Sequence, residues 1–179
     1  LNIESEDYLQ RAIDLFKETN NNFKLSKSYT AYANVFERKQ EYYKAIEMLY
    51  KSLEIDTKSN DKYSIALSKA NLGILHLRIR DFDQAFSYIN DALSFFAESK
   101  MVFETAMVKV ALGEALHAVG RGTEAIKELL EAEDHFTKLD NKHELTKVFE
   151  LLANYISLKG NYEMAFEYQK KYTDGLKYY

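Results

Sequence analysis

Residues 72–92 of this chain read LGILHLRIRDFDQAFSYINDA, and residues 112–132 read LGEALHAVGRGTEAIKELLEA. Both stretches open with Leu-Gly and then place apolar residues three and four positions apart, which is the pattern of an amphipathic helix. A short break with turn chemistry divides each stretch, at residues 80–81 in the first and 120–122 in the second. Each stretch therefore predicts a helix, a tight corner and a second helix.

A shift of 40 residues aligns the whole chain with itself without a gap. Small residues in the shared columns allow close crossing of two helices, and large apolar residues fill the space around the crossings. One hairpin cannot bury its apolar faces alone, so neighbouring hairpins must stack. The main columns are Ser5, Ala45, Ala85, Ala125 and Ala165; Leu9, Leu49, Ile89 and Leu129; Ala12, Ser52, Ala92 and Ala132; Ala33, Gly73, Gly113 and Ala153; and Tyr32, Leu72, Leu112 and Leu152.

The period predicts one all-α domain over residues 1–179, a right-handed α-solenoid of stacked antiparallel helix hairpins with about nine helices. Residues 1–19 match only the second helix of the repeat, and full repeats follow at 23–62, 63–102, 103–142 and 143–179. The chain begins at Leu1 without methionine, which indicates a piece of a longer protein. The first helices are expected at about 24–39, 63–79, 103–119 and 143–159, and the second helices at about 42–55, 82–97, 123–137 and 162–177.

Composition excludes several classes of function. The chain has no cysteine, which rules out disulfides and thiolate metal sites, and its net charge of −4 with interspersed signs argues against a nucleic-acid surface. No apolar run approaches the roughly 18 residues of a membrane span, and no signal peptide is present. The four histidines have no metal-ligand spacing, and the sequence contains no phosphate-binding glycine loop or nucleophile motif. We therefore expect a cytoplasmic protein without cofactor, metal or catalytic residues.

The pattern Leu72-Gly73-x-x-His76, followed by Ala85-x-x-x-Ile89-x-x-Ala92, resembles the signature of the tetratricopeptide repeat (TPR). Residues 112–132 match the same signature, so the resemblance extends over essentially the whole chain. The period of 40 is longer than the usual 34 residues. Repeats of this length resemble the TPR sensor regions of bacterial signalling proteins.

The sequence departs from the TPR pattern at two places in the repeat. Tyr29 and Phe149 occupy the first aromatic position of the family, whereas Lys69 and Lys109 replace the aromatic residue in the middle repeats. The proline that closes each repeat in the family is absent throughout.

The resemblance implies that the first helix of each repeat lines a concave groove and that a bound polypeptide lies in it. Asparagine side chains in such a groove can donate to and accept from an extended peptide backbone, and arginine can grip a carboxylate. A clamp for chaperone tails is not expected, because Leu67 and Ile74 replace its lysine and asparagine in the second repeat. The groove positions are Lys27, Thr30, Asn34, Glu37 and Arg38; Asn71, Ile74, Leu77 and Arg78; Met107, Val110, Glu114 and His117; and Lys147 and Asn154.

These features predict a protein- or peptide-binding scaffold, the partner-sensing module of a bacterial regulatory protein, which takes an extended or helical peptide on its first helices. A scaffold for homo-oligomers is the alternative, since the half repeat at the start and the aromatic residues Tyr172, Tyr178 and Tyr179 provide terminal apolar faces for a homodimer. An enzyme would require a cluster of titratable groups with perturbed pKa values, and the sequence does not indicate one.

Overall fold

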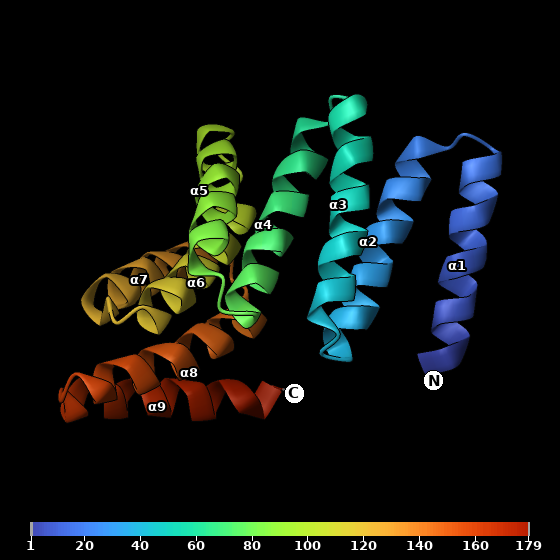
Figure 1. Ribbon diagram of the computed structural model, residues 1–179. Coiled ribbons are helices and arrows are strands. Elements are labelled where there is room, and N and C mark those ends of the chain that lie inside the picture. The colour runs from blue at the N-terminus through green and yellow to red at the C-terminus, as the bar shows by residue number, and fades with distance from the viewer. Residues whose placement is uncertain (1, 179) are drawn as a thin grey trace. The chain divides into compact units, whose positions relative to one another are not determined.

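The computed structural model of the protein describes residues 2–178, with side chains for residues 6–177. This part of the chain consists of nine α-helices and one short 3-10 helix (Figure 1). Each of the first eight α-helices has 17 residues. They are α1 (Asn2–Glu18), α2 (Asn22–Arg38), α3 (Tyr42–Lys58), α4 (Lys62–Arg78), α5 (Phe82–Glu98), α6 (Val102–Ala118), α7 (Gly122–Lys138), α8 (Lys142–Leu158) and α9 (Tyr162–Gly175), followed by η1 (Leu176–Tyr178).

Every junction between these helices contains one residue with left-handed backbone. Gly120 and Gly160, at two of the predicted corners, have φ values of 82° and 83°. The other junctions use a residue with a side chain, which indicates that the corner geometry itself recurs even where glycine is absent. These residues are Asn20, Gln40, Asn60, Arg80, Lys100 and Asp140.

Short polar side chains begin five of the helices, and at α5 the Asp81 carboxylate accepts a longer hydrogen bond of 3.4 Å from the Gln84 amide. The carboxamides of Asn21, Asn141 and Asn161 and the carboxylate of Asp61 each accept a hydrogen bond from the backbone amide three residues later. A cap of this kind stabilises a helix by about 1 kcal/mol. The breaks that the sequence predicts between helical patterns are therefore also the starting signals of the helices that follow.

The chain forms two compact units, residues 1–92 and 93–179, whose boundary lies within α5. In the first unit α2 packs against α1 and α3, and α3 packs against α4, so that consecutive helices lie side by side (Figure 1). Its core contains Ile13, Leu49 and Leu72, all at most 2% exposed. In the second unit α6 packs against α7, α7 against α8, and α8 against α9. The core there includes Leu129 and Phe136, both fully buried.

A polar cluster replaces part of the apolar core in the first unit. Asp56 is 4% exposed and stands in the repeat column that Phe16, Phe96 and Phe136 occupy elsewhere. Its carboxylate accepts hydrogen bonds from Ser26 at 2.5 Å and from Ser52 and Ser68 at 3.4 Å. These bonds give the buried carboxyl oxygens hydrogen-bond donors, and an unpaired polar group would be strongly unfavourable in the interior.

Ion pairs explain why lysine replaces the family's aromatic residue in the middle repeats. The Lys69 ammonium lies 2.6 Å from the Asp91 carboxylate, within the first unit. In the second unit the Lys109 ammonium lies 2.6 Å from Glu128 and 2.7 Å from Glu131. In both middle repeats the lysine on the first helix therefore pairs with carboxylate on the second helix.

In the first and the last full repeat the lysine stands on the second helix instead of the first. Tyr29 and Phe149 replace the lysine on the first helix, and Lys51 and Lys171 stand in the columns of Asp91 and Glu131. The Lys51 ammonium lies 5.8 Å from the Tyr29 ring centroid, and the Lys171 ammonium lies 5.2 Å from that of Phe149. Ammonium groups at this distance are attracted to the face of an aromatic ring. Each repeat thus matches its two positions either as an ion pair or as a cation–π pair.

Lys109→Met is expected to lower the free energy of unfolding at pH 7 by about 1–2 kcal/mol, between the values for exposed and buried ion pairs. Burial lowers the pKa of Lys109, but the hydrogen bonds and charges of Glu128 and Glu131 outweigh burial and raise it. The hydrogen bond from Lys109 lowers the pKa of Glu131. The stabilisation from Glu131 is therefore present above the ordinary carboxyl pKa and disappears as the pH falls through the lowered value.

Urea denaturation of the wild type and the variant between pH 7 and about pH 3 measures this effect. The difference in stability should shrink toward the acid end of the range. Lys127→Met is the matched control, because Lys127 approaches the same Glu131 carboxylate at 3.9 Å but is 72% exposed. Its effect should stay below about 0.5 kcal/mol. A difference between Lys109→Met and the wild type that does not change with pH would contradict the assignment.

Candidate functional site

The predicted groove residues of the first repeat lie on one face of α2. Lys27, Asn34 and Arg38 are separated by seven and four positions, which places them on the same side of a helix. Asn34 and Arg38 are exposed, and the half-buried Lys27 donates a hydrogen bond of 3.1 Å to the Ser64 hydroxyl of α4. This bond connects the first helices of two consecutive repeats. In the first unit α2 and α4 therefore contribute to a common surface.

Two of the residues predicted beside them are engaged within the helices. The half-buried Thr30 hydroxyl makes a hydrogen bond of 3.0 Å with the Ser52 hydroxyl of α3. Leu77 on α4 is only 9% exposed and packs in the interior. Glu37, Asn71 and Ile74 are half-buried, whereas Arg78 is exposed. Asn34, Arg38 and Arg78 are thus the exposed residues among those predicted on this surface.

The remaining predicted residues lie in the second unit, on α6 and α8. Met107 is 37% exposed, while Val110 and Glu114 are half-buried. The His117 ring stacks on the Tyr155 ring of α8, with centroids 3.8 Å apart and planes 9° from parallel. This contact connects consecutive first helices in the second unit. Lys147 and Asn154 on α8 are both exposed.

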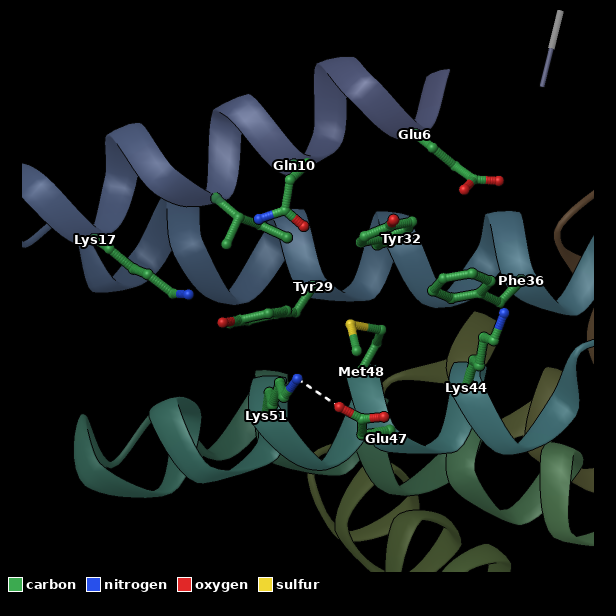
Figure 2. Close-up of a pocket in the computed structure, with 11 residues that line it drawn as sticks. Glu6, Gln10, Lys17, Tyr29, Tyr32, Phe36, Lys44, Glu47, Met48 and Lys51 are labelled. Carbon is green, nitrogen blue, oxygen red and sulfur yellow. Dashed lines mark hydrogen bonds and ion pairs between the residues drawn. The ribbon is translucent and has the colours of Figure 1, made fainter. Parts of the chain in front are cut away.

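The sequence did not predict a cleft on the other face of α2, which we call the α1–α3 cleft. Figure 2 shows it between α1 and α3, with aromatic side chains of α2 between the two helices. Its volume is about 450 Å³. The sequence does carry a signal for it, because two repeat columns change together in the first full repeat. Tyr29 stands in one of these columns and Lys51 in the other. The lining residues are Glu6, Gln10, Ile13, Lys17, Tyr29, Tyr32, Phe36, Lys44, Glu47, Met48 and Lys51.

Neither a membrane span nor a metal site is found among the described residues. No helix in this part of the chain combines the length and apolar character needed to cross a bilayer. Within it, no three His, Asp or Glu side chains are grouped so that they could hold a metal ion.

Comparison with known proteins supports the conclusion that the chain is built from repeats. Residues 24–98 match the sequence model of the family described as tetratricopeptide repeat. Response regulator aspartate phosphatase I of Bacillus subtilis (strain 168) is 32% identical over 112 residues, which cover 56% of this chain. The matched residues make up 26% of that relative, so this chain spans only part of the length of the curated protein.

Solved structures share the fold at low sequence identity. BtubC from P. vanneervenii superposes with a TM-score of 0.81 at 19% identity, over 97% of this chain and 75% of the other. A Rap protein in complex with competence and sporulation factor gives a TM-score of 0.78 at 15% identity, over 97% of this chain and 50% of the other. These likenesses confirm the all-α, TPR-like fold that the sequence predicts. From its repeat columns, its helix hairpins and its match to the family, the chain is a tetratricopeptide repeat protein.

Proposed function

We propose that this chain is a scaffold that binds a polypeptide partner on the first helices of its repeats. The observation that carries the proposal is the surface of α2 and α4, where Asn34, Arg38 and Arg78 are exposed. The Lys27–Ser64 hydrogen bond between the two helices supports their use as one surface. A rigid pair of helices can present these polar groups in a fixed arrangement, which reduces the entropy lost on binding.

The chemistry of this surface suits a peptide with acidic and apolar side chains. Asn34 can donate to and accept from an extended backbone, and Arg38 or Arg78 can bind a carboxylate through two hydrogen bonds. The half-buried Ile74 adds apolar contact on the same surface of the first unit. An apolar centre with a polar rim is typical of surfaces that recognise peptides.

The relatives support a role in regulation. The Bacillus subtilis relative is a response regulator aspartate phosphatase, and a Rap protein of the same fold was solved with competence and sporulation factor. By this likeness we assign the chain to the partner-sensing part of a bacterial regulatory protein that acts in the cytoplasm. Its role in this assignment is binding, with catalysis left to other proteins or domains.

Self-association is the second candidate function. In the last repeat Leu158 is 74% exposed, Tyr162 72% and Phe166 60%, and Tyr172 is half-buried. Tyr178 and Tyr179 lie outside the residues whose side chains the structure describes. Exposed apolar groups gathered in one repeat favour contact with a second copy of the chain. Light scattering at several protein concentrations distinguishes the candidates, because a strict monomer excludes a homodimer.

Neutralising both arginines tests the proposed surface. The double variant Arg38→Gln, Arg78→Gln is expected to bind a partner purified from cells at least about tenfold more weakly, since each arginine can form a charge-assisted hydrogen bond. Stability should change by less than about 1 kcal/mol per site, because these residues end α2 and α4 and interact weakly with the helix dipole. Isothermal titration calorimetry and urea denaturation measure the two effects.

Lys58→Gln is the matched control. Lys58 also ends its helix, α3, and its side chain is 71% exposed in a pair with Glu54. It should leave partner affinity unchanged. Equal loss of affinity in the control, or unchanged affinity in the double variant, would contradict the assignment of α2 and α4.

A further inference from the structure

The α1–α3 cleft is separate from the proposed partner surface. Tyr29 and Phe36 of α2, each 7% exposed, form its floor. Tyr29 and Phe36 are seven positions apart and share one face of α2. Lys27 and Asn34 each stand two positions earlier, which places them on the opposite face. Ile13 of α1 and Met48 of α3 line the walls. A volume of about 450 Å³ is large enough for a short peptide segment or a small molecule.

Two lysine side chains converge at one end of this cleft. The ammonium groups of Lys17 and Lys51 lie 6.0 Å and 5.8 Å from the Tyr29 ring centroid. Figure 2 shows Lys17 extending from α1 and Lys51 from α3 toward the same tyrosine. Two positive charges on opposite sides of one cleft favour an anion between them.

Pairing of the other charges leaves a positive charge at Lys17. Lys44 pairs with Glu41 at 2.5 Å, Lys51 pairs with Glu47 at 2.6 Å, and Glu6 pairs with Lys39 outside the cleft. Among the described residues Lys17 has no carboxylate partner, and its ammonium lies over the Tyr29 ring. The cleft therefore has an excess of one positive charge, which matches a single carboxylate.

The last repeat indicates where that carboxylate would lie. Lys171 and Phe149 occupy the columns of Lys51 and Tyr29, with the ammonium 5.2 Å from the Phe149 ring centroid. There the Glu133 carboxylate of α7 accepts hydrogen bonds from Lys171 at 2.9 Å and from the Tyr168 hydroxyl at 2.7 Å.

The column of Glu133 contains Ile13 in the first cleft. Ile13 is 2% exposed and supplies no charge. The α1–α3 cleft thus has a lysine and an aromatic ring in the same columns as the last repeat. It lacks the carboxylate that pairs with the lysine there.

We propose that the α1–α3 cleft binds a polypeptide partner that presents one carboxylate side chain beside an apolar one. The carboxylate lies between Lys17 and Lys51, near the Tyr29 ring, in the role that Glu133 has beside Lys171. The neighbouring apolar side chain lies against Met48 and Phe36. The occupant carries few negative charges, because Glu6 and Glu47 also line the cleft and repel a strongly acidic segment.

A pair of matched peptides tests this site. The probes are acetyl-Gly-Leu-Glu-Leu-Gly-amide and its counterpart with Gln in place of Glu, added to isotope-labelled protein and followed by NMR chemical shifts. The Glu peptide should shift signals of Lys17, Tyr29 and Lys51 and bind at least about tenfold more tightly than the Gln peptide, as expected for a charge-assisted hydrogen bond. Equal affinity for the two peptides, or no binding, would overturn the proposal.

Variants then connect the affinity to the cleft. Lys17→Met and Lys51→Met keep most of the side-chain stem and should each weaken the Glu peptide about tenfold or more, with thermal unfolding measured to confirm the fold. Lys58→Met, on the exposed side of α3, should have no effect. The Arg38→Gln, Arg78→Gln variant should bind the peptide normally, which separates this site from the partner surface. Weakening by Lys58→Met, or sodium acetate binding as tightly as the Glu peptide, would refute a specific polypeptide site.

Discussion

Gly73→Leu is expected to lower the free energy of unfolding by about 3 kcal/mol, the upper part of the range for an overpacked core. A Cβ atom at Gly73 would lie 2.6 Å from Ile89 Cγ1 and 3.2 Å from the Ala85 carbonyl oxygen of α5. Ile89 and Ala85 are fully buried, so neither can move into solvent. The remaining atoms of leucine would force α4 and α5 apart within the first unit. Urea denaturation of the purified protein measures the loss.

Gly113→Ala is the comparison that separates close packing from helix propensity. A Cβ atom at Gly113 would lie 3.1 Å from Leu129 Cγ, which is tight but less severe than at Gly73. Alanine in a helix is favoured over glycine by about 1 kcal/mol, and this gain should offset the cost of the tight contact. The variant should therefore be close to neutral in stability. If Gly73→Leu were as stable as Gly113→Ala, close helix crossing would not explain why small residues fill the repeat column of Gly73 and Gly113.

Phe136→Ala is expected to destabilise the second unit by about 3–5 kcal/mol. The Phe136 ring is fully buried and contacts the Phe103 ring edge to face, with centroids 5.9 Å apart. Its removal leaves a cavity among helices α6, α7 and α8 that the neighbouring side chains cannot fill without moving. Thermal and urea denaturation should both report the change.

Phe166→Ala provides the matched control in the same unit. Phe166 is 60% exposed and lies under the Lys170 ammonium at 4.5 Å, so its replacement should change stability by less than about 1 kcal/mol. Similar losses for Phe136 and Phe166 would contradict the assignment of Phe136 to the core.

The number and order of helices follow from the sequence because the 40-residue columns repeat without gaps. The predicted ends differ from the observed ones by only a few residues, and Gly120 and Gly160 have the expected left-handed backbone. The left-handed Gln40, Arg80 and Lys100 could not be predicted from residue type, since such residues adopt this conformation at an energetic penalty. There the stacked hairpins on both sides determine the backbone of the corner.

The candidate surface is predictable in part. Helical periodicity alone places Lys27, Asn34 and Arg38 on one face, but it does not report how deeply neighbours cover a position. In the structure Leu77 is more buried than a residue lining a groove would be, and the Thr30 hydroxyl forms a hydrogen bond with the Ser52 hydroxyl. The role of the whole set in binding remains a prediction. The α1–α3 cleft depends on which residues of different helices meet, and this becomes visible only in three dimensions.

Site-specific photo-crosslinking in cells tests most directly whether the first helices bind a polypeptide. A photoreactive amino acid replaces Asn34 on α2 or Asn154 on α8, both exposed, and in the controls it replaces Glu54 on α3 or Asp134 on α7. We expect the same polypeptide to be crosslinked from Asn34 and Asn154 and not from the controls. Equal crosslinking of that polypeptide from Glu54 and Asp134, or none from Asn34 and Asn154, would contradict the proposed binding surface.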